Sequence, residues 1–147
     1  MDFTVQLRSR DAELAESLQA RMRLRDVSLF KCEAKGAGPP NTPVEPVSLT
    51  VDLDSAVSLQ TAGGIDFAVT LRVACASALT FHIEVTYLVR YCYFGGAKLA
   101  SKTELAAFCK GSPAMAAWPY IRETVQSLAT RMGFPTEPLP LLRLIVG

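Results

Sequence analysis

The residues of this chain that could perform chemistry are few and widely spaced. Its single histidine, His82, lies two positions before Glu84 in an alternating segment, so the two side chains share one face of a predicted strand. No serine or cysteine can be placed beside them from the sequence. A histidine on the polar face of a strand is typically solvated, so this pair does not predict a catalytic site.

The four cysteines indicate neither a metal site nor a nucleophile. Cys32, Cys75, Cys92 and Cys109 form no Cys-x-x-Cys pair, which excludes the usual spacing of a zinc site. Cys75 falls on the apolar face of a predicted strand, where a thiol behaves as a small buried hydrophobe. An enzyme using Cys109 or His82 would need a strongly perturbed titrating group in a cleft. We therefore predict a protein that is not an enzyme and that has no cofactor.

Composition excludes several classes of partner. The formal net charge is +1 and the basic residues are dispersed, so no nucleic-acid footprint is present. The glycine pairs at 63–64 and 95–96 read as turns, because neither leads from a strand into a helix start as a phosphate-binding loop does. Partners must therefore be sought through apolar surface.

Size and location are also bounded by the sequence. With 147 residues, half of them hydrophobic, the chain can bury the core of a single domain, 1–147. Residues 1–14 carry charges where a signal peptide needs an apolar run, and no stretch approaches the roughly 18 apolar residues of a membrane span. We expect a cytoplasmic protein with reduced cysteines and no membrane insertion.

An amphipathic helix and then a sheet are predicted in the first two thirds of the chain. Residues 11–25 place Leu14, Leu18 and Met22 four apart among helix formers, which predicts a helix with one apolar stripe. Residues 26–94 are predicted to hold the strands. Alternating apolar residues mark them at 27–32, less regularly, and then at 47–53, 65–75 and 81–91. The short break at 76–79 favours an antiparallel hairpin, because a parallel crossover needs a dozen or more residues.

The period changes to helical after the second glycine pair, so helices are predicted within 101–132. Ser101 and Glu104 form a capping box. Pro119 favours a break at Trp118, followed by a second helix that ends at Gly133. The tail, 134–147, has too many prolines for regular structure and too many leucines for a solvated segment, so we expect it to pack onto another surface.

Taken in order, these segments resemble the SecB-type chaperones over roughly 26–142. The resemblance is carried by 25–28, 49–56, 67–73 and 81–85, and above all by Trp118-Pro-Tyr-Ile-Arg-Glu123 followed by 127–131 and Phe134-Pro135. It implies an α+β fold, in which a four-stranded antiparallel sheet carries helices on one side and an N-terminal amphipathic helix precedes it. It also implies a dimer of dimers that holds non-native polypeptides, without ATP, in hydrophobic grooves for delivery to the SecA motor.

The resemblance assigns roles to nine residues. Client contact is expected at Leu105, Phe108, Trp118 and Tyr120, although a tryptophan before a proline is also a common core anchor. The assembly face is expected at Ile83, Val85 and Tyr87, and SecA docking at Asp26 and Glu84. Association is expected through the outer strands and the helix 101–110.

Two departures favour a particular branch of this family. Phe30 and His82 replace an acidic and an aliphatic residue of the SecA-docking pattern. The helix before the first strand, and the lack of a polar C-terminal extension, resemble the SecB-like chaperones of toxin–antitoxin systems, whose client is an antitoxin. The alternative is a non-catalytic scaffold whose apolar strand faces are consumed by self-association.

Overall fold

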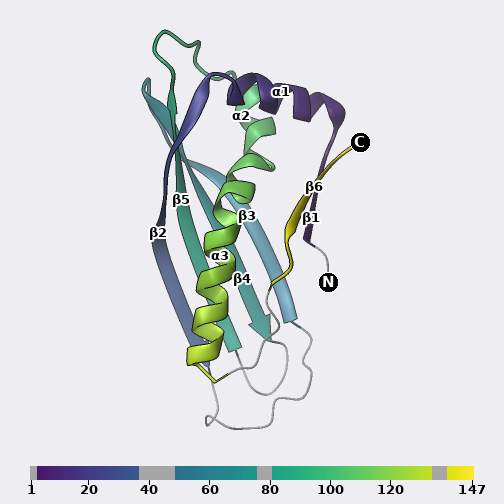
Figure 1. Ribbon diagram of the computed structural model, residues 1–147, viewed down its shortest axis with the longest axis vertical. Coiled ribbons are helices and arrows are strands. Elements are labelled where there is room, and N and C mark those ends of the chain that lie inside the picture. The colour runs from purple at the N-terminus through teal and green to yellow at the C-terminus, as the bar shows by residue number, and fades with distance from the viewer. Residues whose placement is uncertain (1–2, 37–48, 76–80, 134–138) are drawn as a thin grey trace.

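The computed structural model describes residues 3–36, 49–75, 81–133 and 139–147 (Figure 1). Six strands and three helices lie in this part of the chain, in the order β1 (Phe3–Leu7), α1 (Ser9–Gln19), β2 (Met22–Gly36), β3 (Leu49–Gln60), β4 (Gly64–Cys75), β5 (Phe81–Tyr93), α2 (Lys102–Cys109), α3 (Ser112–Arg131) and β6 (Leu142–Val146).

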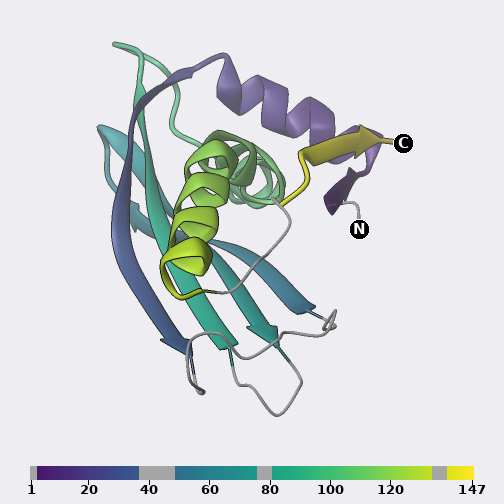
Figure 2. The ribbon, with the colours of Figure 1, turned by 60° about the horizontal axis from the view of Figure 1, so that its bottom comes forward.

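The main sheet is four-stranded and antiparallel, with the strand order β2-β5-β4-β3. β4 and β5 form the predicted hairpin, with Val69 opposite Tyr87 at its middle. The connection predicted at 76–79 lies outside the described residues. The helices lie on one side of the sheet (Figure 2). The predicted α+β fold class is therefore confirmed.

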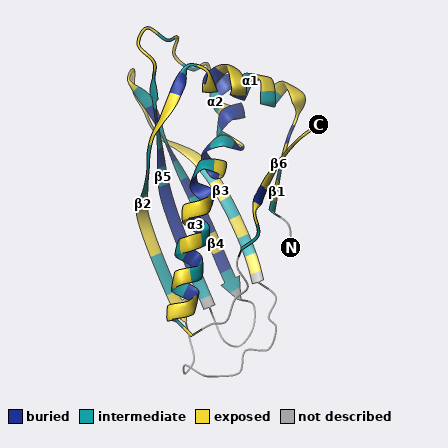
Figure 3. Cartoon of the chain, in the orientation of Figure 1, coloured by how far each residue is buried: buried dark blue, intermediate teal, exposed yellow. Residues whose placement is uncertain are grey.

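One face of the two central strands forms the core. Every second side chain of β4 and β5 points to this face and is buried: Ile65, Phe67, Val69, Leu71, Val73, Ile83, Val85, Tyr87, Val89 and Tyr91. α3 runs lengthwise over this face, and Figure 3 shows its sheet side buried and its outward side exposed. Alanines at 114, 117 and 129 are buried in α3, and such small side chains allow a helix to approach a sheet closely.

The predicted helix break at Trp118 is wrong, because α3 continues without interruption through Pro119. A proline inside a helix removes the N–H that would bond to the carbonyl four residues earlier, here that of Met115. Trp118 and Ile121 on either side of the proline are both buried in the core. Packing of both halves against the sheet therefore outweighs the lost hydrogen bond.

The N-terminal helix exists but is shorter than predicted. α1 ends at Gln19, and Met22 already belongs to β2, opposite Tyr93 of β5. Leu18 and Met22 of the predicted stripe are buried, and Leu14 is half-buried. The segment 22–25 alternates apolar with basic residues, so pairing with β5 overrides its helical propensity.

A second sheet joins the two ends of the chain and corrects the prediction for the tail. β6 pairs in parallel with β1, with Phe3 opposite Leu142 and Leu7 opposite Val146. The tail therefore contains regular structure, although its predicted packing is confirmed by the burial of Leu142. Neither strand was predicted, because each has five residues and each depends on a partner at the other end of the sequence.

The approach of β4 to β5 predicts a strong effect at Gly64. A Cβ atom on Gly64 would lie 2.1 Å from the backbone oxygen of Tyr91, whereas a Cβ atom on Gly63 would meet only Thr61 Oγ1 at 3.8 Å. We expect Gly64→Ala to lower the free energy of unfolding by about 2–3 kcal/mol, because the hairpin must separate to admit the methyl group. Gly63→Ala is the control. Equal stability of the two variants in urea unfolding would contradict this packing.

Candidate functional site

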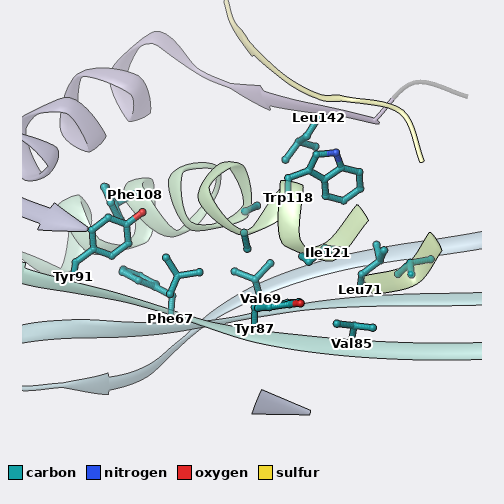
Figure 4. Close-up of a cluster of buried hydrophobic side chains, with 14 of the residues drawn as sticks. Phe67, Val69, Leu71, Val85, Tyr87, Tyr91, Phe108, Trp118, Ile121 and Leu142 are labelled. Carbon is teal, nitrogen blue, oxygen red and sulfur yellow. The ribbon is translucent and has the colours of Figure 1, made fainter. Parts of the chain in front are cut away.

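Trp118 lies where the C-terminal segment crosses α3. Its indole Nε1 donates a hydrogen bond to the backbone oxygen of Pro140 at 2.9 Å, and the Phe3 ring of β1 lies 5.1 Å from its ring. One turn later, Arg122 Nε donates to the backbone oxygen of Leu139 at 2.7 Å. Trp118 is only 3% exposed, so β1 and the C-terminal segment together cover it (Figure 4).

Apolar side chains are exposed beside this tryptophan. On the C-terminal segment, Leu141 is 67% exposed, and Leu144, Ile145 and Val146 are 40–52% exposed. Leu144 lies against Gly111, and Met115, one turn further along α3, is also exposed. We call these five residues the C-terminal apolar surface. Several exposed apolar side chains within one short segment mark an interaction site more often than isolated exposed leucines do. It was missed by sequence reasoning, although the leucine content of the tail was the available signal.

Two of the four predicted client residues do not lie at the surface. Phe108 is fully buried against Phe67 and Tyr91, with ring distances of 5.4 and 5.0 Å (Figure 4). Its predicted role as a client contact is therefore corrected to that of a core residue. Trp118 is buried with β1 in place, as the alternative of a core anchor anticipated.

The other two are accessible to different extents. Leu105 is half-buried on α2, and Tyr120 is 48% exposed on α3, with its ring 6.0 Å from that of Tyr87. Leu29 is opposite Tyr87 on the edge strand β2, and both Leu29 and the adjacent Phe30 are more than half exposed. We call Leu29, Phe30 and Tyr120 the β2 edge surface.

The predicted assembly face is also corrected. Ile83, Val85 and Tyr87 belong to the core face of β5 under α3 and are buried within this one chain. The alternation that suggested an apolar face was interpreted correctly, but α3 of the same chain covers it. Such residues are not available to a second subunit in this structure.

Asp26 and Glu84 lie on the opposite face of the sheet, among charged partners. Glu84 accepts hydrogen bonds from Lys31 Nζ at 3.2 Å and Arg72 Nε at 2.9 Å. The Lys31 hydrogen bond, more than that of Arg72, lowers the pKa of the Glu84 carboxyl. Asp26 lies 3.7 Å from Arg90. Both residues therefore share a face, but the Glu84 charge is already balanced within the chain.

Cys109 and His82, the two residues considered for catalysis, lie on different elements, α2 and β5. The Cys109 thiol donates to the backbone oxygen of Ser55 at 3.3 Å, and burial raises its pKa, which disfavours the nucleophilic thiolate. His82 is half-buried on the outer face of β5, between Ala74 and Lys35. Cys75 has no described side chain. In the described ranges, no helix is long and apolar enough to cross a membrane.

An ion pair fixes α2 and thereby Leu105 and Phe108. The Arg21 guanidinium binds both carboxylate oxygens of Glu104, at 2.7 and 2.8 Å. Glu104 also completes the predicted capping box with Ser101, and accepts a hydrogen bond from Ser17 of α1. The turn between α1 and β2, the helix α1 and the start of α2 are thus joined at one carboxylate.

This carboxylate predicts a pH-dependent contribution to stability. The Arg21 hydrogen bonds, opposed by burial and assisted by Ser101 and Ser17, hold the pKa of Glu104 far below its ordinary value of 4.5. The unfolded chain therefore binds the extra proton first, and the stabilisation is full above pH 4.5 and decreases as the pH falls below it. We expect Glu104→Gln to cost about 1.5–3 kcal/mol at pH 7.

Urea unfolding of the wild type and Glu104→Gln at pH 7 and pH 3 checks this expectation. The difference between the two proteins must shrink at pH 3, because there the unfolded wild-type chain is stabilised by protonation of Glu104 and the glutamine variant has no such group. A difference of equal size at both pH values would contradict the role of the charge.

The positions of Trp118 and Tyr120 predict losses of stability of very different size. Trp118→Ala empties a buried site and is expected to lower the free energy of unfolding by about 3–5 kcal/mol. Tyr120→Ala, two positions away on the exposed side, is expected to cost less than about 1 kcal/mol. Chemical unfolding of both variants measures this, and similar losses would show that Tyr120 also belongs to the core.

The comparisons with known proteins identify the fold. No family model matches the chain, and no curated protein matches it in sequence. Among solved structures, the Mycobacterium tuberculosis Rv1957 SecB-like chaperone, in complex with a ChAD peptide from the Rv1956 HigA1 antitoxin, superposes with a TM-score of 0.79 at 21% identity, covering 90% of this chain and 99% of the other. A protein of unknown function from Streptococcus agalactiae has a TM-score of 0.45 at 9% identity, with 82% and 97% covered. The chain therefore has the fold of a SecB-like chaperone.

Proposed function

We propose that this protein is a non-catalytic chaperone that binds unfolded segments of a client polypeptide without ATP, and that its client is an antitoxin. The observation that carries the proposal is the C-terminal apolar surface beside Trp118, on a fold shared with a chaperone that binds an antitoxin peptide. Apolar contact of this kind needs no nucleophile, metal or cofactor, because removal of apolar surface from water supplies the free energy.

Two features favour an antitoxin over export clients delivered to SecA. The helix α1 precedes the sheet, as it does in the toxin–antitoxin branch that the sequence resembles. On the sheet face where SecA would dock, Glu84 is already bound by Lys31 and Arg72, so its charge is less available to a basic partner.

The proposed location is the cytoplasm. Cys32, Cys92 and Cys109 are free thiols, which fits function in this reducing compartment.

The proposal includes a homotetramer, formed as a dimer of dimers, which uses an outer strand of the predicted contact, β2, but not the helix 101–110. α2 packs against α1 and buries Phe108 within the chain, so the helix 101–110 contributes little apolar surface. Among the described residues β2 is the last strand on its side of the sheet, and the β2 edge surface adds exposed apolar side chains, of which Phe30 is 68% exposed. Such an edge favours pairing with the same edge of a second copy.

Client binding is expected to depend on the C-terminal apolar surface. The double variant Leu141→Ser, Ile145→Ser should bind an unfolded client about tenfold more weakly, a loss of about 1.4 kcal/mol. The matched control is Leu59→Ser, Phe94→Ser, which removes two side chains that are also about half exposed but lie elsewhere. Fluorescence anisotropy with labelled, reduced and carboxymethylated α-lactalbumin, which cannot refold, measures both affinities.

The outcomes separate the proposal from its alternatives. If both double variants bound the unfolded client equally weakly, the client would not bind specifically at the C-terminal apolar surface. Failure of the wild type to bind any unfolded polypeptide would favour the self-assembling scaffold. Because the net charge is only +1, binding should change little between low and high salt, and steep weakening would indicate a charged site instead.

A further inference from the structure

β1 is not part of the main four-stranded sheet. Within the described residues its only strand partner is β6, and the two strands pair in parallel as a separate two-stranded sheet (Figure 1). Parallel pairing is slightly weaker per residue than antiparallel pairing, and isolated two-stranded units are marginally stable. β1 is therefore held mainly by its side chains and not by its ladder.

Those side chains occupy the candidate client site. Phe3, Val5 and Leu7 point inward, where the Phe3 ring packs on Trp118 at 5.1 Å. The side chains of Val5 and Leu7 reach within 4.0 Å of the position that a Cβ atom on Gly111 would take. Thr4 and Gln6 are exposed. β1 is thus a short extended segment with an apolar residue at every second position. An unfolded client segment could offer the same extended backbone and the same apolar side chains.

β1 can detach while α1 stays in place. α1 is anchored by the fully buried Leu18 and by the ion pair between Asp11 and Lys110, the residue after the end of α2, at 2.9 Å. Arg8, the residue between the strand and the helix, makes no side-chain cap to α1. No described hydrogen bond of α1 therefore requires β1 to remain docked on β6, apart from the chain connection itself.

We propose that β1 is a built-in competitor for the client site. A client segment with an aromatic residue followed by aliphatic residues at alternate positions displaces β1, pairs in parallel with β6 and places its aromatic ring on Trp118. This inference rests on the proposed chaperone function. It adds the sequence pattern that the client should have, and it states that docking of β1 lowers the affinity of the protein for that client. The measured affinity is then lowered by the fraction of molecules in which β1 is docked.

Competition predicts that weakening β1 tightens client binding. The probe is a fluorescein-labelled peptide, FTVQLRS, which copies residues 3–9, and the comparison peptide FTQVRSL has the same composition but no two apolar residues at alternate positions. The full-length Phe3→Ala variant should bind the first peptide about tenfold more tightly than the wild type, and the second peptide no more tightly. Val5→Ala should act in the same direction, and Thr4→Ala, an exposed neighbour, should match the wild type.

Two readouts follow β1 directly. Trp118 is the only tryptophan, so its emission should shift to longer wavelength in Phe3→Ala and return when the peptide binds. Amide hydrogen exchange of residues 3–7 should accelerate in the wild type when saturating peptide is added. Peptide binding that leaves these amides protected would overturn the inference, because the peptide would then be adding to a free edge.

The same experiment distinguishes this inference from the function it rests on. If unfolded α-lactalbumin binds equally to the wild type, Phe3→Ala and Val5→Ala, the chaperone function stands and the competition is overturned. If unfolded α-lactalbumin does not bind at all, the proposed function fails. In that case a peptide that still displaces β1 would support the strand site alone, and a peptide that does not would overturn it as well.

Discussion

The structure depends on covering one apolar face of two strands. β4 and β5 present ten side chains on this face, all nearly inaccessible to solvent. Burying each large apolar side chain contributes about 1.5–3 kcal/mol, so an uncovered face would leave the sheet unstable. α3 is the element long enough to run along both strands, and a break at Pro119 would expose half of them. The penalty of about 3 kcal/mol for a proline inside a helix is small beside this burial.

Because the helices lie on one side, the two faces of the sheet are stabilised differently. The outer face has no helix from the described part of the chain, and its strands are joined by polar contacts across the ladder. Arg72 bridges Asp52 and Glu84, and the Thr70 and Thr86 hydroxyls hydrogen bond at 2.8 Å. Exposed ion pairs contribute little to stability, so this face specifies strand register more than it supplies free energy. Apolar surface for partners remains at the rims, along β2 and beside β6.

The sequence predicts the parts of this fold whose signals are local. The alternation in 65–75 and 81–91, the capping box of Ser101 with Glu104, and the positive φ of 77° at Gly133 all depend on neighbours in the chain. The continuity of α3, the early start of β2 and the pairing of β1 with β6 depend on distant residues, and all three were missed. For the candidate site, the sequence indicated the region around Trp118, and its role in client binding stays a prediction. It could not distinguish Phe108, which the sheet buries, from Tyr120, which α3 leaves exposed.

The parallel pairing of β1 with β6 has a consequence for folding order. Its register joins Phe3 to Leu142, so the contact closes a loop that contains nearly the whole chain. Because loop closure over this length costs entropy, we expect the contact to form late, once the β4–β5 hairpin and the packing of α3 have brought both ends near each other. During synthesis, β1 emerges first and β6 last, so the apolar side chains of β1 remain without this partner until the rest of the domain has been made.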